Sequence, residues 1–178
     1  MNQLFTASNT DDGMAADGGG GRVAFIQSCW HRDIVDQCKT AFLANMGPGG
    51  VPADRIDLFE VPGAFELPLL AKQLAASGQY AAIVASGFVV DGGIYRHEFV
   101  ASAVIDGLMR VQLDSGVPVL SAVLTPHHFQ EGAAHIAFFQ EHFLLKGAEA
   151  AAACLQTMRN LRRVALLGAA PASGGPRP

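Results

Sequence analysis

Four short stretches of the sequence place polar or aromatic residues directly after an apolar run. The most informative is "FVVDGGIYRHEFV" (88–100), in which two glycines precede a pair of cationic residues. Glycines after a strand let backbone N–H groups approach an oxyanion, and a helix start carries about half a positive charge. Arg96 and His97 in a first helical turn each cost about 0.3–1 kcal/mol unless an anion binds there. The stretch therefore predicts an anion site, against the alternative of an exposed turn whose charges are solvated.

Two further stretches carry groups that could hold a substrate. In "SCWH" (28–31), Trp30 could stack on a flat heterocycle, although a tryptophan there could also close the top of the core. In "VPGAFE" (61–66), the Pro-Gly pair predicts a tight turn before a helix. Glu66 in the first turn of that helix either suits the helix dipole or accepts hydrogen bonds from a polyol or amide. The sequence leaves both alternatives open.

The fourth stretch, "TPHHF" (125–129), begins a region rich in histidine. His128, His135 and His142 recur at intervals of seven residues. Seven residues make about two helical turns, so these side chains are too far apart to share one ion. No carboxylate or cysteine completes a familiar ligand set. We therefore expect no metal, and we interpret the histidines as solvated or interface residues, with His135 as a candidate anion contact.

Composition excludes several classes of protein. The 178-residue chain suits one compact domain, and its net charge of −4 without a basic run gives no reason to expect nucleic acid as a partner. No apolar run approaches the roughly 20 residues that span a bilayer, and no signal-peptide pattern begins the chain. Cys29, Cys38 and Cys154 lack metal-type spacing and fit a reducing compartment. We expect a cytoplasmic protein with no membrane partner.

Apolar runs and helical patterns alternate along the chain. The expected strands are 22–27, 55–61, 81–90 and 117–125, and the expected helices are 33–46, 64–77, 96–115 and most of 131–163, with a break near Gly147. One face of the third helix combines Phe99, Val100, Ala103, Val104, Leu108 and Val111. Because two of the strands are apolar on both faces, we predict an α/β fold. It is a three-layer α/β/α sandwich with a four-stranded parallel sheet, flavodoxin-like in architecture.

The expected domain organisation is simple. Residues 1–20 are polar and Gly-rich and should form a flexible arm, 21–163 a single domain, and 164–178 a C-terminal tail. In a parallel sandwich of this kind, ligands lie beyond the carboxyl ends of the strands. All four stretches described above fall at that edge.

In this order and on this framework, the four stretches resemble the lumazine synthase family. The residues that carry the likeness are "FIQSCWH", "EVPGAFELPL", "GFVVDGGIYRHEFV", "GVPVLSAVLT" and "KGAEAA", which span about residues 22–160. The "DGGIYRH" and "TPHHF" versions resemble the type II form, which some bacteria carry as a second copy.

The resemblance implies a transferase of riboflavin biosynthesis. Such an enzyme condenses 5-amino-6-(D-ribitylamino)uracil with 3,4-dihydroxy-2-butanone 4-phosphate to give 6,7-dimethyl-8-ribityllumazine, phosphate and water. It uses no metal and no redox cofactor. The resemblance also implies self-assembly into pentamers with active sites between neighbouring subunits, and, for the type II form, a decamer of two pentamers.

Position by position, the resemblance assigns roles to residues of this chain. The positions matched to the pyrimidine ring and its ribityl chain are Trp30, Ala64, Phe65, Glu66, Phe88, Val89, Val90 and Ser121. The positions matched to the phosphate are Gly93, Ile94 and His135. Lys146 matches a lysine that a neighbouring subunit contributes.

The catalytic position departs from the family pattern. Arg96 aligns with the family's catalytic histidine, His97 follows one place later, and Ile94 replaces a small hydroxyl residue. Arginine stays protonated and suits phosphate, whereas histidine, with an ordinary pKa near 6.5, suits proton transfer. Our hypothesis is that Arg96 orients phosphate or steadies charge and that His97 is a proton shuttle or a subunit contact. The alternatives are a catalytically weak assembly that binds flavin or lumazine, and an unrelated flavodoxin-like nucleotide-binding protein.

Overall fold

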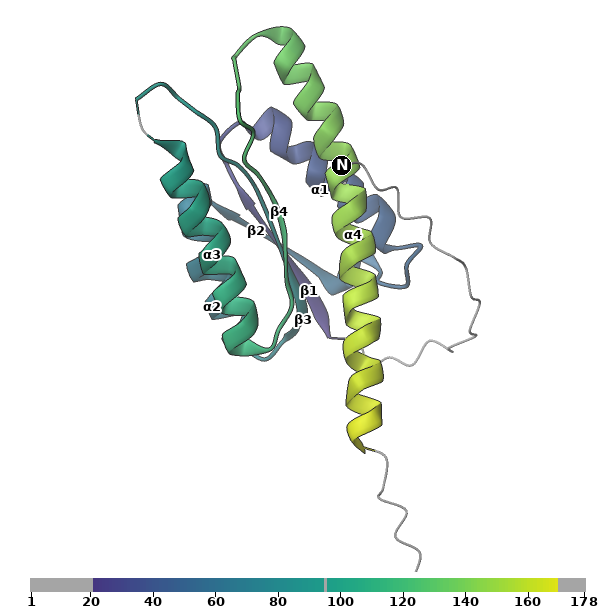
Figure 1. Cartoon of the computed structure of the whole chain (residues 1–178). Helices are drawn as coiled ribbons and strands as arrows, with labels where there is room; N and C mark the ends of the chain where they lie inside the picture. Colours follow the sequence, from purple (N-terminus) through teal and green to yellow (C-terminus); the bar gives the residue numbers. More distant parts are fainter. Residues whose placement is uncertain (1–20, 95, 170–178) are drawn as a thin grey trace, which may run out of the picture.

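A parallel sheet of four strands forms the centre of the protein in the computed structural model (Figure 1). The structure describes residues 21–94 and 96–169. The strands are β1 (Arg22–Ser28), β2 (Ile56–Val61), β3 (Tyr80–Phe88) and β4 (Val119–Leu124), and they lie in the order β2-β1-β3-β4. The predicted four-stranded parallel sheet is therefore confirmed.

Helices cover both faces of this sheet, as Figure 1 shows. The helices α1 (Arg32–Met46) and α4 (Ala133–Ala169) pack on one face, and α2 (Leu67–Ala76) and α3 (His97–Ser115) pack on the other. Two short 3₁₀ helices, η1 (Ala53–Arg55) and η2 (Ala64–Glu66), precede β2 and α2. The three-layer sandwich is thus confirmed. Among the described residues, no helix combines the length and apolar character that a membrane crossing requires.

The alternation of side chains along the central strands explains their continuous apolar runs. In β1, Phe25 faces α1 and α4, whereas Ile26 faces α2 and α3. In β3, Val84 faces α1 and α4, and Ile83 faces α2 and α3. All four of these side chains are fully buried. A strand buried on both faces needs apolar residues at every position. The core therefore consists of two layers separated by the sheet.

The predicted break near Gly147 is wrong, because α4 is continuous from Ala133 to Ala169. Gly147 lies where α4 crosses α1. A Cβ at this position would collide with the backbone carbonyl oxygen of Cys38 and would lie 2.9 Å from the Cβ of Ala41. The glycine therefore permits close packing of two helices and does not end one.

The start of α3 also differs from the prediction. Arg96 is the N-cap residue with an extended ψ of 92°, so the helix itself begins at His97. Val104 and Leu108 face the core as expected. Phe99 is 67% exposed and Ala103 is exposed as well, so the predicted place of these two on the buried face is wrong. The Arg96 guanidinium lies over the Phe99 ring, with 5.6 Å from Cζ to the ring centroid.

Candidate active site

The carboxyl ends of the four strands meet along one edge of the sheet. Ser28 at the end of β1 pairs with Val61 at the end of β2, and Phe88 at the end of β3 pairs with Leu124 at the end of β4. Pairing continues one residue beyond β3, because the Val89 N–H donates to the carbonyl oxygen of Leu124 at 2.9 Å. The four loops that follow these strands therefore lie together at one end of the molecule.

Trp30 projects from the first loop beside the second. Its side chain is 68% exposed, so it does not close the top of the core, and that alternative is excluded. The indole Nε1 lies 4.0 Å from the position that a Cβ on Gly63 would take, and Glu66 Oε2 lies 3.2 Å from the same position. Gly63 thus separates an exposed aromatic face from a carboxylate, and any side chain at 63 would fill that space.

Glu66 has a structural role in the second loop. Its Oε2 accepts a hydrogen bond from the backbone N–H of Gly63 at 2.9 Å, and its own N–H donates to the Gly63 carbonyl oxygen at 3.4 Å. This reciprocal pair closes the first turn of η2, in the manner of a capping box. Glu66 is exposed, and its other carboxylate oxygen, Oε1, takes no part in this pair. The two readings of Glu66 left open by the sequence are therefore compatible.

Ala64 anchors the same loop to the sheet. Its side chain is buried, and a Cβ on Gly87 of β3 would lie 3.5 Å from the Ala64 Cβ and 3.0 Å from Ser28 Oγ. Phe65, the next residue, is exposed. The second loop is consequently held against the sheet by the buried Ala64 side chain, while Phe65 and Glu66 are exposed to solvent.

The glycine-rich loop surrounds an open pocket of about 240 Å³. Its lining residues are Asp91, Gly93, Ile94, Arg96, His97 and Glu98. Gly93 has a φ of +74°, and its backbone N–H donates to Asp91 Oδ1 at 2.8 Å. Ile94 is 82% exposed at the rim. The lining thus combines the Arg96 guanidinium and the His97 imidazole with the carboxylates of Asp91 and Glu98, and the Gly93 N–H is already engaged by Asp91.

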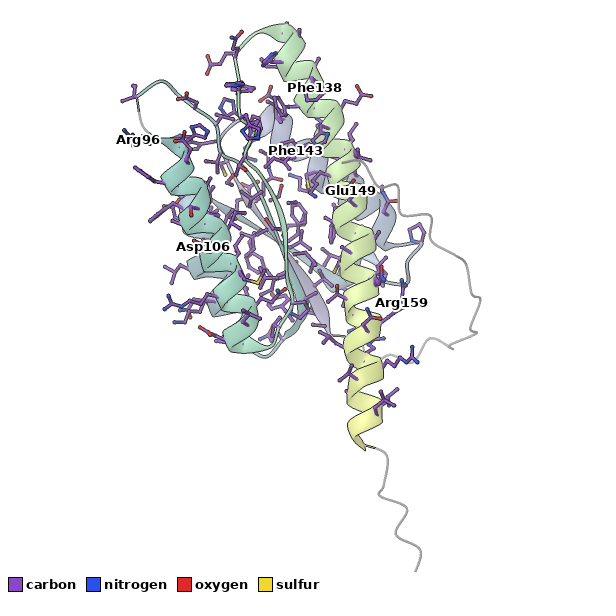
Figure 2. The ribbon with its side chains drawn as sticks, viewed as in Figure 1. Arg96, Asp106, Phe138, Phe143, Glu149 and Arg159 are labelled. Carbon is purple, nitrogen blue, oxygen red and sulfur yellow. The ribbon has the colours of Figure 1, made fainter. Side chains whose placement is uncertain are left out.

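Both members of the cationic pair line this pocket. Successive residues within a helix point about 100° apart, so two helical neighbours could not both face one pocket. Arg96 has an extended backbone and precedes the helix, so this restriction does not apply to Arg96 and His97. The His97 side chain is only 13% exposed, and its Nδ1 lies 3.7 Å from Glu98 Oε2. Figure 2 shows Arg96 at the start of α3. Arg96 is therefore exposed, whereas the His97 side chain is largely buried.

Several predicted site residues do not line this pocket in the protomer, among them Ser121, His135 and Lys146. Ser121 is exposed in the middle of β4, opposite Ala85, three residues before the strand ends. His135 Nδ1 accepts a hydrogen bond from the Gln130 N–H at 3.2 Å. Lys146 Nζ pairs with Glu149 Oε2 at 3.2 Å, thirteen residues into α4 and so about 20 Å along its axis.

An aromatic cluster that the sequence did not predict lies behind the loops. Phe88 is buried, and its ring meets the rings of His31, Phe129, Phe139 and Phe143 with centroid separations of 4.9–5.6 Å. Figure 2 labels Phe143 on the part of α4 that faces the sheet. The Phe88 side chain thus points toward the face of the sheet that α1 and α4 cover. The spacing of four residues between Phe139 and Phe143, which places both on one face of a helix, is the sequence feature that could have indicated this cluster.

An ion pair holds the first loop against β2. Both terminal guanidinium nitrogens of Arg32 contact the Glu60 carboxylate at 2.8 Å, and Nη2 also lies 3.1 Å from Cys29 Sγ. The hydrogen bond from Arg32 holds the pKa of Glu60 below its usual value. Within the described ranges, no group of three or more His, Cys, Asp or Glu side chains is placed to hold a metal ion.

The fold and these loops define a flavodoxin-like α/β protein with an exposed tryptophan, a carboxylate and a glycine-rich pocket along one edge of its sheet. A family model described as 6,7-dimethyl-8-ribityllumazine synthase matches residues 20–162. The chain belongs to this family, and the resemblance noted in its sequence is confirmed.

Relatives match over most of their length. A protein of Rhodococcus erythropolis named 6,7-dimethyl-8-ribityllumazine synthase is 61% identical over 143 residues, which cover 80% of this chain and 92% of the relative. Two proteins named 6,7-dimethyl-8-ribityllumazine synthase 2 come from Pseudomonas syringae pv. tomato and Bradyrhizobium diazoefficiens. They are 57% and 54% identical, over 83% and 80% of this chain and 87% and 86% of their own.

Proposed function

We propose that this protein is a transferase of riboflavin biosynthesis. It condenses 5-amino-6-(D-ribitylamino)uracil with 3,4-dihydroxy-2-butanone 4-phosphate and releases 6,7-dimethyl-8-ribityllumazine, phosphate and water. The observation that carries the proposal is the placement of Trp30, Glu66 and the glycine-rich pocket along one sheet edge, in a chain of this family. Membership of the family disfavours a protein that only binds flavin or lumazine.

The reaction requires that two substrates be held together. The ring amine adds to the ketone, water leaves to give an imine, phosphate is eliminated, and a second condensation closes the ring. Correct placement of two reactants can supply about 7–11 kcal/mol of a barrier. Trp30 stacks on the pyrimidine, the second carboxylate oxygen of Glu66 accepts a hydrogen bond from the ribityl chain, and the backbone of 88–90 borders the ring. No metal and no redox cofactor takes part.

Residues of the glycine-rich loop and the start of α3 bind the phosphate and carry out the proton transfers. The Gly93 and Ile94 backbone and the Arg96 guanidinium hold the phosphate, because arginine is a permanent cation with a donor geometry that matches phosphate oxygens. His97 moves protons, because imidazole is the side chain that can give and accept a proton near neutral pH. The low exposure of its side chain, beside an exposed Arg96, supports this division. Ile94 offers no hydroxyl group, so phosphate binding is weaker than in family members that have one.

Self-assembly completes the site. We propose pentamers, joined in pairs as decamers, in which a neighbouring subunit contributes Ser121, His135 and Lys146. None of the three lines the pocket of its own chain, which supports this arrangement. Exposed apolar side chains on the outer helices also support it, since large apolar patches on a protein surface commonly mark interfaces. The three free thiols favour the cytoplasm as the compartment.

One assay tests the function. The purified protein is mixed with both substrates, and the fluorescent lumazine and released phosphate are measured together, beside a mass measurement of the assembly. We expect equimolar lumazine and phosphate. A protein that binds lumazine but forms none would contradict the proposal.

Two variants test the division of roles, with Arg110→Ala on the exposed side of α3 as a matched control. His97→Ala should lower kcat at least about a hundredfold with lumazine binding intact, within the range that proton transfer supplies. Arg96→Ala should mainly raise KM for the phosphate substrate. The reverse pattern would show that Arg96, and not His97, occupies the catalytic role.

A further inference from the structure

His31 has an unusual backbone conformation directly beside Trp30. Its φ of 51° and ψ of 50° place it in the left-handed region, and it is the one non-glycine residue with positive φ among those the structure describes. Residues other than glycine adopt this conformation at a cost, which persists only where the surroundings enforce it. The chain therefore turns sharply after Trp30.

The backbone of His31 is held by the helix that follows. Its carbonyl oxygen accepts hydrogen bonds from the N–H groups of Ile34 at 2.9 Å and Val35 at 3.0 Å, which starts α1. The imidazole makes no capping hydrogen bond to the helix. The side chain is thus available for another contact, and a capping function alone does not account for it, because an asparagine would cap and would tolerate the conformation.

The His31 ring packs between two other parts of the site. It meets Phe88 at the end of β3 edge-on, with 5.6 Å between centroids and 85° between planes. It meets Phe129, in the loop after β4, at 5.1 Å and 73°. Edge-to-face pairs of this kind stabilise a contact by about 0.5–1.5 kcal/mol. The first loop is therefore attached to the third and fourth strand ends through one ring.

We propose that His31 is a positioning residue for Trp30. The left-handed backbone and the packed imidazole together fix the direction in which the exposed indole leaves the first loop, beside Gly63. Within the protomer Trp30 is 68% exposed, so burial by its own chain does not fix it. The proposal rests on the proposed function in one respect, namely that the indole then stacks on the pyrimidine substrate.

Two substitutions separate the parts played by the ring and the backbone. His31→Asn tolerates the left-handed conformation but removes the ring, whereas His31→Phe retains a ring that can pack between Phe88 and Phe129. His128→Asn, at an exposed histidine of the fourth loop, is the matched control. Trp30 is the single tryptophan of the chain, so its fluorescence reports its surroundings without a label.

We expect His31→Asn to shift Trp30 emission and to change its quenching by acrylamide in the ligand-free protein. In the assay, KM for the pyrimidine should rise about three- to tenfold with kcat and the KM for the phosphate substrate nearly unchanged, as expected for a lost stacking geometry. His31→Phe should restore both readouts. Unchanged emission and KM in His31→Asn, or no rescue by His31→Phe, would overturn the proposal. If the parent forms no lumazine, the proposed function fails, and the quenching data alone decide the role of His31.

Discussion

The Asp91 carboxylate accepts a hydrogen bond from the backbone N–H of Gly93, with 2.8 Å between Oδ1 and N. The same N–H is one that we propose to meet the phosphate of the substrate. Carboxylate and phosphate are both anions, so each disfavours the other at this donor. Asp91 also lines the pocket together with Glu98, which adds a second negative charge near a site for an anion.

Asp91→Asn should therefore strengthen phosphate binding. Asparagine keeps a side-chain oxygen for the Gly93 N–H, so the turn is retained while the charge is removed. We expect the inhibition constant for inorganic phosphate and the KM for the butanone phosphate to fall about three- to tenfold, the scale of one charge repulsion near a surface. Asp114→Asn, at the far end of α3, makes the same change in net charge. Equal effects of both variants would exclude a local role for Asp91.

Glu66 offers a test that separates support of the loop from contact with the substrate. Glu66→Ala removes the acceptor for the Gly63 N–H and should lower the free energy of unfolding by about 0.5–2 kcal/mol, as for loss of a helix cap. Glu66→Gln retains an acceptor oxygen, so most of this stability should return. KM for the pyrimidine should rise in both variants, because neither presents a charged oxygen to the ribityl chain. A normal KM in Glu66→Gln would limit Glu66 to its structural role.

Sequence patterns predicted the sheet and the loop cluster because parallel strands bring their carboxyl ends to one edge whatever the details of packing. Trp30 and Glu66 were placed correctly on that basis. The patterns failed where one residue type has two physical uses. Gly147 could end a helix or allow two helices to touch, and only the position of α1 decides between these. Phe99 follows the helical period of the buried face, but it lies in the first turn of α3, where the ring is left largely exposed.

Other features of the site depend on geometry that sequence does not encode locally. The left-handed backbone of His31 has no residue signature comparable to a glycine at a turn. The cluster around Phe88 joins aromatic residues from four separate segments. Ser121 and Lys146 are predicted from family resemblance alone, and a single chain leaves them away from the pocket.

Gly147 provides a test of the α1–α4 contact. A methyl group there would meet the Cys38 carbonyl and the Ala41 side chain, so Gly147→Ala should destabilise the fold by about 1–3 kcal/mol, as overpacking does elsewhere. Gly168→Ala lies in the same helix with open space around it and should gain up to about 1 kcal/mol from helix propensity. Urea unfolding at one fixed protein concentration measures both. A neutral or stabilising Gly147→Ala would show that the helices can separate without cost.

The amino-terminal ends of three strands share a polar network whose contribution depends on pH. Arg22 of β1 donates two hydrogen bonds to Asp57 of β2, and the Tyr80 hydroxyl of β3 donates to Asp57 Oδ2 at 3.0 Å. The hydrogen bonds from Arg22, and then from Tyr80, hold the pKa of Asp57 below its usual value. Folding thus favours the charged carboxylate. Its stabilisation is complete above the unfolded pKa near 4 and is lost as the pH falls through the lower folded value.

Asp57→Asn should accordingly be less stable than the parent at neutral pH, and the difference should shrink as the pH falls from about 5 to about 2. Asp114→Asn, which breaks an exposed pair with Arg110, should cost less at neutral pH because such pairs contribute little. Urea midpoints of the parent and both variants, measured across this pH range, test these expectations. Because the network joins β1, β2 and β3 at the end opposite the active site, kcat and KM should remain those of the parent wherever the variant is folded. A difference in stability that stays constant down to about pH 2 would mean that Asp57 acts by shape and not by charge.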